Sequence, residues 1–567
     1  MSGRRFELSK TWQGLRGAAF GLPQSVVIGQ ARVGDLSVHD LERLEARVLL
    51  SNGIVLQRFP PGADLAHRFV FRVLDWIGAV QRLARVSVAE RVHLRELKGL
   101  EGPAPAPRVF QLAVACGNRR ASEITARWVR AQLGTLFDSG TDSEQIEQDA
   151  DWLQAQLQAH ADPGLNRFHL VQAALRLGIP VFPVGRSLLA LGTGIHQRLQ
   201  HSTLTDDTPN IAVRITTSKH QTAALLRAAG LPGTEHLRAA SADEAVAAAA
   251  RIGYPVVVKP DDQEQGRGVQ ANLVHDAQVA KAWRAARAHS KHILVERWVD
   301  GSTHRLTVFR GRVIRVVRRL AGGVTGDGTH SIRDLLDLAA RPGAAQALAT
   351  PEGAGPVTLD EEALDLLSQS GLNAEHVPPA GVRVRLRRRD NINAGGRNEE
   401  LALAAVHPDN LQLALDAASL MRLDIAGVDL ISLDIGTSWL DNGASICEVN
   451  AMPQLGVGGD AAIYEKILSE LMGGRYAIPV QVVLSPADAP ARRQALEHCL
   501  RQQDGAVVSD VSGLWMEGRR VARAFAHGFD AAVAVLLRPD VTRAVCLMSV
   551  AELAAMGFPV GRVDQVG

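Results

Sequence analysis

The sequence predicts an α/β (α+β) protein of several domains, and three observations support this. The chain has 567 residues, the length of roughly three or four domains. Hydrophobic residues make up 46% and charged residues 22%, a balance that allows a globular protein several buried cores. Between residues 165 and 474, strand-like runs alternate with amphipathic helical stretches, which is typical of layered sheets and helices.

Charge and composition exclude several classes of function. The formal net charge is +2, so no overall basic field favours a nucleic acid or a membrane surface as partner. No apolar run reaches the roughly 18 residues of a membrane-spanning helix. The basic N-terminus is not followed by an apolar stretch, so we expect no signal peptide and a cytoplasmic protein. The four cysteines are scattered, which is typical of a reducing compartment and not of a disulfide or zinc framework.

The chain divides into three predicted parts. Residues 1–164 form a small α/β N-terminal domain, in which a proline-rich break at 101–107 precedes a strand at 109–115 and a helix at 121–133. Residues 165–475 form the main domain. Residues 476–567 form a second small α/β piece.

A candidate phosphate-binding element lies near residue 260. Three successive valines predict a buried strand that ends at Lys259 and is stopped by Pro260. A lysine there is costly unless it meets an anion. The glycines of the loop 261–268 let the backbone approach phosphate oxygens closely, although the Gly-Lys-Ser/Thr element of a Walker loop is missing. The alternative is a plain hairpin turn.

Two further segments carry oxygen ligands. A strand at 293–299 with Glu296 among apolar residues can bind an adenine edge, or it can be an ordinary half-buried strand. In the strand 445–450, alternation places Glu448 and Asn450 on one face, and the strand 425–431 offers Asp429. Carboxylate and amide oxygens suit Mg²⁺. The alternative is that these carboxylates only accept hydrogen bonds at strand ends.

An arginine-rich strand is predicted at 382–389. Alternation places valine and leucine on one face and Arg383, Arg385, Arg387 and Arg389 on the other. Such a face repels itself unless phosphate, a substrate carboxylate or acidic partners neutralise it. The alternative is a solvated edge strand.

These elements, in their order, resemble the ATP-grasp domain of cyanophycin synthetases, which are related to glutathione synthetase and to the enzymes that add glutamate to a ribosomal protein. The similarity covers nearly the whole chain. Its specific stretches are Leu191–Arg198, Ser218–Thr222, Leu226–Pro232, Lys259–Gly268, Val324–Ile332, Pro378–Gly381, His407–Asn410 and Glu448–Pro453. The resemblance implies an ATP-grasp fold for residues 165–475, with a substrate-binding N-terminal domain before it.

The resemblance also implies roles for particular residues. ATP as cofactor would be bound by residues at the phosphates and around the adenine: Lys219, Lys259, Gly266, Arg267, Gly268, Glu296, Trp298 and Val299. Mg²⁺ would be held by Asp429, Glu448 and Asn450. The catalytic or substrate side would be formed by Arg387, Arg305 and His330.

The last part resembles the start of the Mur-ligase-type domain that follows in this family. A strand at 478–484 corresponds to its first strand, but the loop 485–491 lacks the lysine and hydroxyls of the phosphate-binding loop. Two prolines remove backbone donors there, and Asp488 would repel phosphate. We therefore expect a truncated, degenerate remnant without a second ATPase site. The alternative is an accidental likeness of a generic α/β piece.

The resemblance implies an ATP-grasp ligase that is ADP-forming and joins a carboxylate to an amine through an acyl-phosphate. We expect an amino-acid or peptide substrate and a homo-oligomer, a dimer or a tetramer. Within enzymes, a different dipeptide or a small metabolite is an alternative product. Outside enzymes, the alternative is a nucleotide-binding pseudo-ligase that acts as a scaffold or partner of another enzyme.

Overall fold

The computed structural model describes residues 5–51, 53–97, 107–137, 143–263, 267–340, 357–388, 395–456, 461–486, 488–502 and 505–567. The chain forms two compact units. Unit 1 joins Met1–Ser202 to Ala461–Gly567, and unit 2 is the continuous segment Thr203–Asp460. Among the described residues, no helix combines the length and apolar character needed to cross a membrane.

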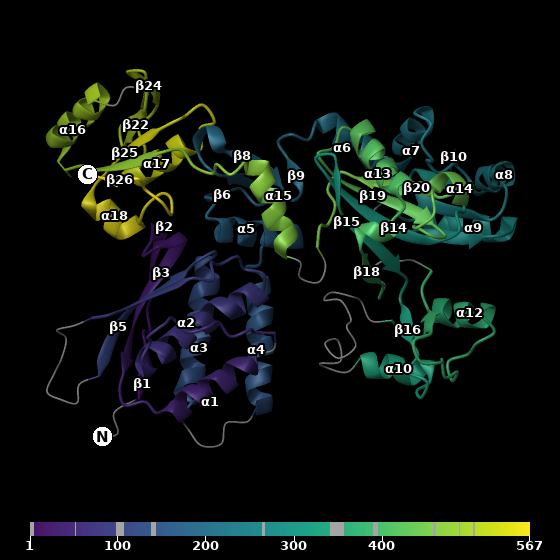
Figure 1. Ribbon diagram of the computed structural model, residues 1–567, viewed down its shortest axis with the longest axis horizontal. Coiled ribbons are helices and arrows are strands. Elements are labelled where there is room, and N and C mark those ends of the chain that lie inside the picture. The colour runs from purple at the N-terminus through teal and green to yellow at the C-terminus, as the bar shows by residue number, and fades with distance from the viewer. Residues whose placement is uncertain are drawn as a thin grey trace. The chain divides into compact units, whose positions relative to one another are not determined.

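The first part of unit 1 is an antiparallel sheet covered by helices on one face (Figure 1). Its strands lie in the order β1-β3-β5-β4, with β2 paired to β3. The strands are β1 (Phe6–Leu8), β2 (Gln13–Ala19), β3 (Leu22–Val33), β4 (Val92–Glu96) and β5 (Arg108–Ala115), and the helices are α1 (Val38–Leu49), α2 (Leu65–Leu83), α3 (Arg119–Gly134) and α4 (Ser143–Gln158). The expected strand at 109–115 and helix at 121–133 are thus confirmed.

Helix α2 is the centre of this part. Asp64 caps its first turn by accepting a hydrogen bond from the N–H of His67, a common way to satisfy a helix start. Phe69 and Trp76 on α2 are fully buried and pack in one core with Phe110 of β5. Large apolar side chains on both the sheet and the helix therefore hold the layers together.

The rest of unit 1 comes from two distant parts of the chain. The first supplies α5 (Leu165–Leu177), β6 (Val181–Val184), β7 (Leu188–Leu191), η1 (Gly194–His196) and β8 (Arg198–His201). The second supplies α15 (Ala461–Met472), β21 (Val480–Leu484), α16 (Ala489–Gln502), β22 (Val507–Asp510), β23 (Gly513–Met516), β24 (Arg519–Ala522), α17 (Gly528–Leu536), β25 (Ala544–Met548), α18 (Val550–Met556) and β26 (Gln565–Val566). Strands β22, β25, β21 and β26 form a parallel core, as expected of an α/β piece.

Two glycines explain how these segments fit together. Gly194 has φ +58°, and a Cβ there would lie 2.3 Å from the carbonyl oxygen of Val541. At Gly192, a Cβ would lie 2.7 Å from the carbonyl oxygen of Tyr476. Only glycine allows both the backbone conformation and the close approach. The run Leu191–Arg198, one of the stretches that carry the family resemblance, thus lies against the C-terminal segment of unit 1.

Unit 2 begins with β9 (Leu204–Thr205) and two helices, followed by an antiparallel sheet of order β10-β13-β11-β12. Helices α8 and α9 pack against this sheet, and alanine and valine side chains fill the space between them. The elements are α6 (Asn210–Thr217), α7 (Lys219–Ala228), β10 (His236–Ala239), α8 (Ala242–Ile252), β11 (Val256–Pro260), β12 (Gln270–Leu273), α9 (Asp276–Arg287) and β13 (Ile293–Arg297).

A second antiparallel sheet of unit 2 has the order β18-β15-β14-β19-β20 (Figure 1). Its core lies against α13 and includes Leu306, Val428 and Val449. The elements are β14 (Ser302–Phe309), β15 (Arg312–Leu320), β18 (Arg397–Leu401), η3 (Leu403–Ala405), α13 (Pro408–Leu420), β19 (Ile425–Ser432), α14 (Trp439–Asn442) and β20 (Ser445–Asn450).

A smaller lobe of unit 2 corrects the predicted arginine strand. It contains β16 (Gly323–Thr325), α10 (Ile332–Ala339), α12 (Glu361–Gln369) and β17 (Arg383–Arg385). The strand ends after three residues because the N–H groups of Leu386 and Arg387 both donate to the carbonyl of Gly322. Both side chains are buried, whereas Val382 is exposed, so the predicted alternation is wrong at Leu386 and Arg387. Arg389 lies outside the described residues.

The compact units differ from the predicted three-part division. Residues 165–202 and 461–475 belong to unit 1, together with the N-terminal and C-terminal pieces. The boundaries at 164 and 475 stay predictions. The fold class itself is confirmed: both units combine helices with sheets.

Candidate active site

Lys259 and Glu296 form a buried ion pair on adjacent strands. β11 and β13 are antiparallel, and Lys259 lies opposite Leu294 while Glu296 lies opposite Val257. The Lys259 Nζ contacts Glu296 Oε2, and the two side chains are only 8% and 5% exposed. Burial by itself lowers the pKa of Lys259, but the charge of Glu296 outweighs it and raises that pKa above its usual value. The lysine therefore remains a cation at the end of a buried strand, as the sequence predicted.

Lys219 approaches the same region from a helix. It is the first residue of α7, directly after Ser218, whose side chain caps the helix. Its Nζ donates to the carbonyl of Gln263 at 2.7 Å and lies 3.6 Å from Glu448 Oε1. The ammonium thus joins the start of the glycine-containing loop to the strand that carries Glu448.

Asp261 positions this helix start. Its carboxylate accepts hydrogen bonds from the N–H of His220 at 3.0 Å, from Ser218 Oγ and from Arg238 Nη2 at 3.0 Å. Burial opposes the charged form, but these donors keep the pKa of Asp261 below its usual value. A carboxylate at the end of β11 therefore holds the end of α7 from which Lys219 projects.

The predicted metal ligands lie together on two neighbouring strands. In the register of β19 and β20, Asp429 is opposite Glu448, and Gly427 is opposite Asn450. Glu448 and Asn450 are half-buried on either side of the buried Val449, so they share a face as predicted. Asp429 is buried and accepts two hydrogen bonds from Arg305, at 2.5 and 2.9 Å. Burial opposes the charged form of Asp429, but Arg305 and Arg319 lower its pKa.

The donor set fits magnesium bound together with a phosphate ligand better than a closed protein cage. In the described part of the chain, no group of three or more histidine, cysteine or acidic residues is arranged to hold a metal ion. Asp429 already faces two arginines, whereas Glu448 is 29% exposed and has its lysine contact at 3.6 Å. Two carboxylates and an amide are hard oxygen donors, and Mg²⁺ usually takes one or two carboxylates and completes its shell with water and phosphate.

Cys447 lies among these charges without being a nucleophile. It sits between Ile446 and Glu448 on β20, and its Sγ lies 3.4 Å from the carbonyl oxygen of Asp429. Burial and the neighbouring carboxylates raise the pKa of the thiol far above its usual value. Since the thiolate is the reactive form, this cysteine is inert at neutral pH.

Other predicted residues lie apart from these contacts. Arg387 is buried against Asp360 and Thr358 in the smaller lobe of unit 2. His330 is exposed and bonds Asp327 in the turn before α10. Among the described residues, neither side chain forms a hydrogen bond or ion pair with Asp429 or Glu448, so their catalytic roles stay predictions.

The structure describes four of the five residues considered next, which were predicted to lie at the adenine or in the phosphate loop. Trp298 and Val299 follow directly after β13 and are half-buried, and Trp298 donates to Asp300. Arg267 and Gly268 are part of a turn, and Gly268 has φ +70° beside His289. Gly266 lies outside the described residues. Their contacts with ATP stay predictions.

Sequence reasoning missed three residues that shape the site. Arg319 lies 3.4 Å from Asp429 Oδ2, and Asp261 holds the start of α7. His236 on β10 is 2.9 Å from His220 on α7. The sequence shows Arg319 among the arginines of β15 and Asp261 directly after Pro260. Their partners, Asp429 and His220, are 110 and 41 residues away, so sequence spacing could not predict these contacts.

Two family models match segments that lie almost entirely in unit 2. A family model described as an ATP-grasp domain matches residues 212–303, and a model of the RimK-like ATP-grasp domain matches residues 380–464. These two segments include β13 with Glu296 and the strands β19 and β20, which carry the cluster around Asp429.

The chain is also similar to larger enzymes. It is 29% identical to a cyanophycin synthetase of Crocosphaera subtropica over 68% of this chain and 44% of the relative. It is 28% identical to one of Synechocystis sp. over 75% of this chain and 48% of the relative. A glutathione biosynthesis bifunctional protein of Streptococcus agalactiae is 34% identical over 31% of this chain and 24% of its own length.

The family models and the relatives indicate the same class of protein. The chain is similar to the ATP-grasp ligases, because two ATP-grasp family models match separate parts of it and its relatives include cyanophycin synthetases. Within that class it is similar to the cyanophycin synthetases, and it spans less than half the length of those it matches. The predicted resemblance to cyanophycin synthetase-like ATP-grasp ligases is confirmed.

Proposed function

We propose that this chain is an ADP-forming ligase that joins a carboxylate to an amine, acting on an amino acid or a peptide. The observation that carries the proposal is the convergence of three cation–carboxylate pairs in unit 2: Lys259 with Glu296, Lys219 with Glu448, and Arg305 with Asp429. The cations suit the phosphates of ATP, and the carboxylates suit Mg²⁺.

The reaction has two steps. A carboxylate oxygen of the first substrate attacks the γ-phosphorus of ATP, which forms an acyl-phosphate and releases ADP. The nitrogen of an amine then attacks the acyl carbon, which forms the amide bond and releases phosphate. The protein's contribution to such phosphoryl transfer is positioning and charge stabilisation.

Each charged residue has a proposed task. Lys219 and Lys259 offset the negative charge that ATP brings, and Lys219 also fixes the loop at Gln263. Arg305 keeps Asp429 oriented by a two-point contact. Asp429, Glu448 and Asn450 would hold Mg²⁺, which supplies charge neutralisation at the phosphates. A covalent protein nucleophile is not required, in agreement with the raised pKa of Cys447.

The finer expectations remain part of this proposal. The substrate pair is an amino acid or peptide carboxylate with an amine, and aspartate-type chemistry is one such pair. We also propose a cytoplasmic homo-oligomer, a dimer or a tetramer. The C-terminal segment 476–567 is proposed to be a degenerate remnant, because its loop after β21 lacks a lysine.

The test is a screen of amino-acid and peptide pairs for ATP-dependent phosphate release, with mass spectrometry of the amide product. The full chain should release phosphate with at least one pair. Glu448→Ala should lower kcat by about a hundredfold or more, because a charge-stabilising group at the phosphates is lost. Glu361→Ala, at an exposed glutamate on α12, serves as the matched control and should retain full activity.

Other results of this screen would contradict the ligase proposal. If the wild type releases no phosphate with any pair, the ligase proposal fails. If it still binds ATP in calorimetry under those conditions, the chain is a nucleotide-binding pseudo-ligase. Equal activity of Glu448→Ala and the wild type would show that Glu448 on β20 is not part of the active site.

A further inference from the structure

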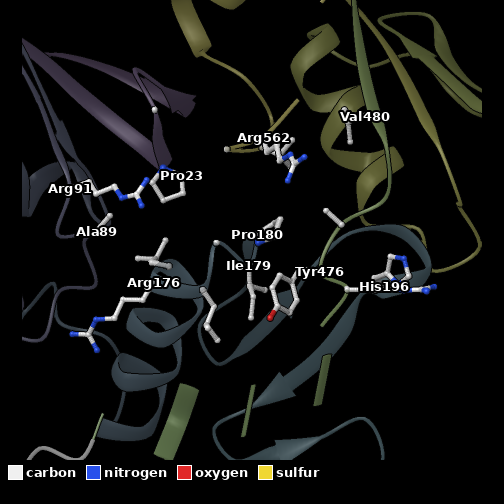
Figure 2. A pocket seen from close by; sticks show the side chains of 18 of the residues that line it. Pro23, Ala89, Arg91, Arg176, Ile179, Pro180, His196, Tyr476, Val480 and Arg562 are labelled. Carbon is white, nitrogen blue, oxygen red and sulfur yellow. The ribbon is translucent and has the colours of Figure 1, made fainter. Parts of the chain in front are cut away.

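Unit 1 contains a cavity of about 910 Å³ that is separate from the charged cluster of unit 2 (Figure 2). Five segments that are distant in sequence contribute to its lining, which includes Gly21 and Pro23, residues from 88–91, 172–180, 474–480 and 560–564, and His196. All of them belong to unit 1. Its volume is within the range of small-molecule sites, which occur where several chain segments meet.

The charges around this cavity are unbalanced. Arg91, Arg475 and Arg562 line it, are exposed, and form no ion pair within the described residues. They come from three different segments, and Figure 2 places Arg91 and Arg562 on different sides of the opening. Like charges that share an opening repel one another unless an anion neutralises them.

The acidic residues of the lining are already engaged. Glu90 Oε1 accepts from both Arg176 Nε and Arg176 Nη2, at 2.9 and 2.7 Å. Asp564 Oδ2 accepts from the N–H of Val480 at 2.8 Å. Neither carboxylate is therefore directed at the three arginines, and the cavity keeps an excess of positive charge.

One wall of the cavity is apolar and fixed in place. Ile179, Pro180 and Ile478 contribute apolar surface, and the phenol of Tyr476 lies beside them (Figure 2). The N–H of Ile478 donates to Thr193 Oγ1 at 3.0 Å, and the N–H of Thr193 donates to the carbonyl of Tyr476 at 3.1 Å. An apolar wall beside guanidinium groups suits an organic body that carries anionic groups.

We propose that this cavity binds a small organic anion with at least two carboxylate or phosphate groups. Each guanidinium can hold one such group through two parallel hydrogen bonds. Three arginines on separate segments favour a ligand with separated charges over a single inorganic ion. The cavity lies at the amino end of β21, whereas the loop 485–491, where the related fold has its phosphate-binding loop, follows the carboxyl end of that strand.

Hydrogen-exchange mass spectrometry of the full chain tests this site directly. The probes are triglutamate and citrate for the carboxylate class and tripolyphosphate for the phosphate class, each at millimolar concentration. At least one probe should slow exchange in residues 88–91 and 474–478. The class that protects identifies the acidic group, and protection in unit 2 reports separately on the proposed nucleotide site.

Charge-removing variants provide the second measurement. In Arg91→Gln/Arg475→Gln/Arg562→Gln, calorimetric affinity for the protecting probe should fall by at least about tenfold, since hydrogen bonds to charged groups are lost. Arg32→Gln/Arg127→Gln/Arg519→Gln removes the same charge from exposed positions outside the lining and should bind as the wild type. Arg562→Glu alone is a milder variant and should also weaken binding.

Two results would overturn the proposal. One is that no probe protects the cavity segments in the wild-type chain. The other is that the control triple variant loses as much affinity as the cavity variant, which would mean that diffuse charge attracts the probe. Neither result depends on whether unit 2 catalyses ligation.

Discussion

Buried charges at the candidate site are arranged in pairs across different elements. Lys259 and Glu296 join β11 to β13, and Arg305 joins β14 to Asp429 on β19. Taking a charge out of water is costly, and a partner on the next strand offsets most of that cost. Under the proposed function, the same charges would be available to ATP and Mg²⁺. Removal of one partner of a buried pair leaves the other charge uncompensated, so it should destabilise unit 2.

The first prediction concerns Arg305. Arg305→Met leaves the buried Asp429 with Arg319 as its remaining arginine, at 3.4 Å. Loss of one partner of a buried pair typically lowers the free energy of unfolding by about 3–5 kcal/mol. Because Arg319 still compensates Asp429, we expect a decrease near the lower end of this range. Urea unfolding of the full chain measures it.

The double variant Arg305→Met/Asp429→Leu is the control for this prediction, because it removes both charges. It should recover much of the lost stability. An unchanged unfolding midpoint in the single variant would contradict a buried charged pair.

The second prediction concerns pH and the histidine pair. Burial and the nearby Lys259 lower the pKa of His236 from 6.5 to about 4, and its Nε2 lies 2.9 Å from His220 Nδ1. Between pH 6.5 and 4 the unfolded chain binds more protons at this residue, so the free energy of unfolding should fall as the pH falls through this range. Above pH 6.5 the residue should contribute no pH dependence.

The measurement is the urea midpoint of the wild type and of His236→Asn across this pH range. The variant should lose part of the acid-side slope. His289→Asn, at an exposed histidine on the loop after α9, should keep the full slope. Parallel pH profiles of His236→Asn and the wild type would contradict the assigned burial effect.

At the scale of elements, the antiparallel register of β14, β19 and β20 creates the site. Arg305 lies opposite Asp429, and Asp429 lies opposite Glu448, so three charged residues from three strands form one row across the sheet. A shift of one residue in either pairing would turn a side chain to the other face. The neighbouring apolar residues Val428 and Val449 are buried on the core side and hold the register.

The third prediction tests the space beside this row. A Cβ at Gly427 would lie 2.8 Å from Arg305 Nη1 and 2.9 Å from Pro453 Cβ. Gly427→Ala should therefore push Arg305 away from Asp429 and lower kcat by about tenfold or more, because small displacements at a reacting centre are costly. Overpacking should cost only about 1–3 kcal/mol of stability.

Phosphate release and thermal unfolding measure the two effects. Gly134→Ala is the control, since a Cβ there has no neighbour within 4 Å. Wild-type turnover in Gly427→Ala would contradict the prediction that the observed position of Arg305 is required for the reaction.

At the scale of the whole molecule, unit 2 is continuous in sequence and unit 1 is not. Thr203 Oγ1 donates to the carbonyl of Pro453 at 3.0 Å, so the two ends of unit 2 lie close together. Unit 2 has cores of its own in both of its larger sheets. Unit 1, by contrast, needs residues from both ends of the chain.

The fourth prediction follows from this difference. The fragment 203–460 should fold alone and unfold cooperatively in a thermal scan followed by circular dichroism, because its core and hydrogen bonds are internal. The fragment 1–202 should be less stable than it is in the full chain, because it lacks the segment that packs on Gly192 and Gly194. A fragment 203–460 without a cooperative transition would contradict an independent unit.

The sequence by itself predicted the resemblance to ATP-grasp ligases and the strands that carry the candidate site residues. The strand ending at Lys259, the strand carrying Glu448 and Asn450, and the order of motifs are local features, because strand alternation and glycine turns depend on neighbouring residues. The predicted arginine strand at 382–389 was wrong because the N–H groups of Leu386 and Arg387 donate to the carbonyl of Gly322, which ends the strand. A local sequence pattern cannot predict such a long-range hydrogen bond.

Only the tertiary structure decided which charges meet. Asp261 with α7, Arg319 with Asp429, and His220 with His236 are contacts between elements far apart in the chain. It also decided that the glycines at 192 and 194 face the C-terminal segment and that three arginines surround one cavity in unit 1. These contacts depend on packing between segments that are far apart in the chain. Sequence spacing therefore does not predict which of these segments lie close together.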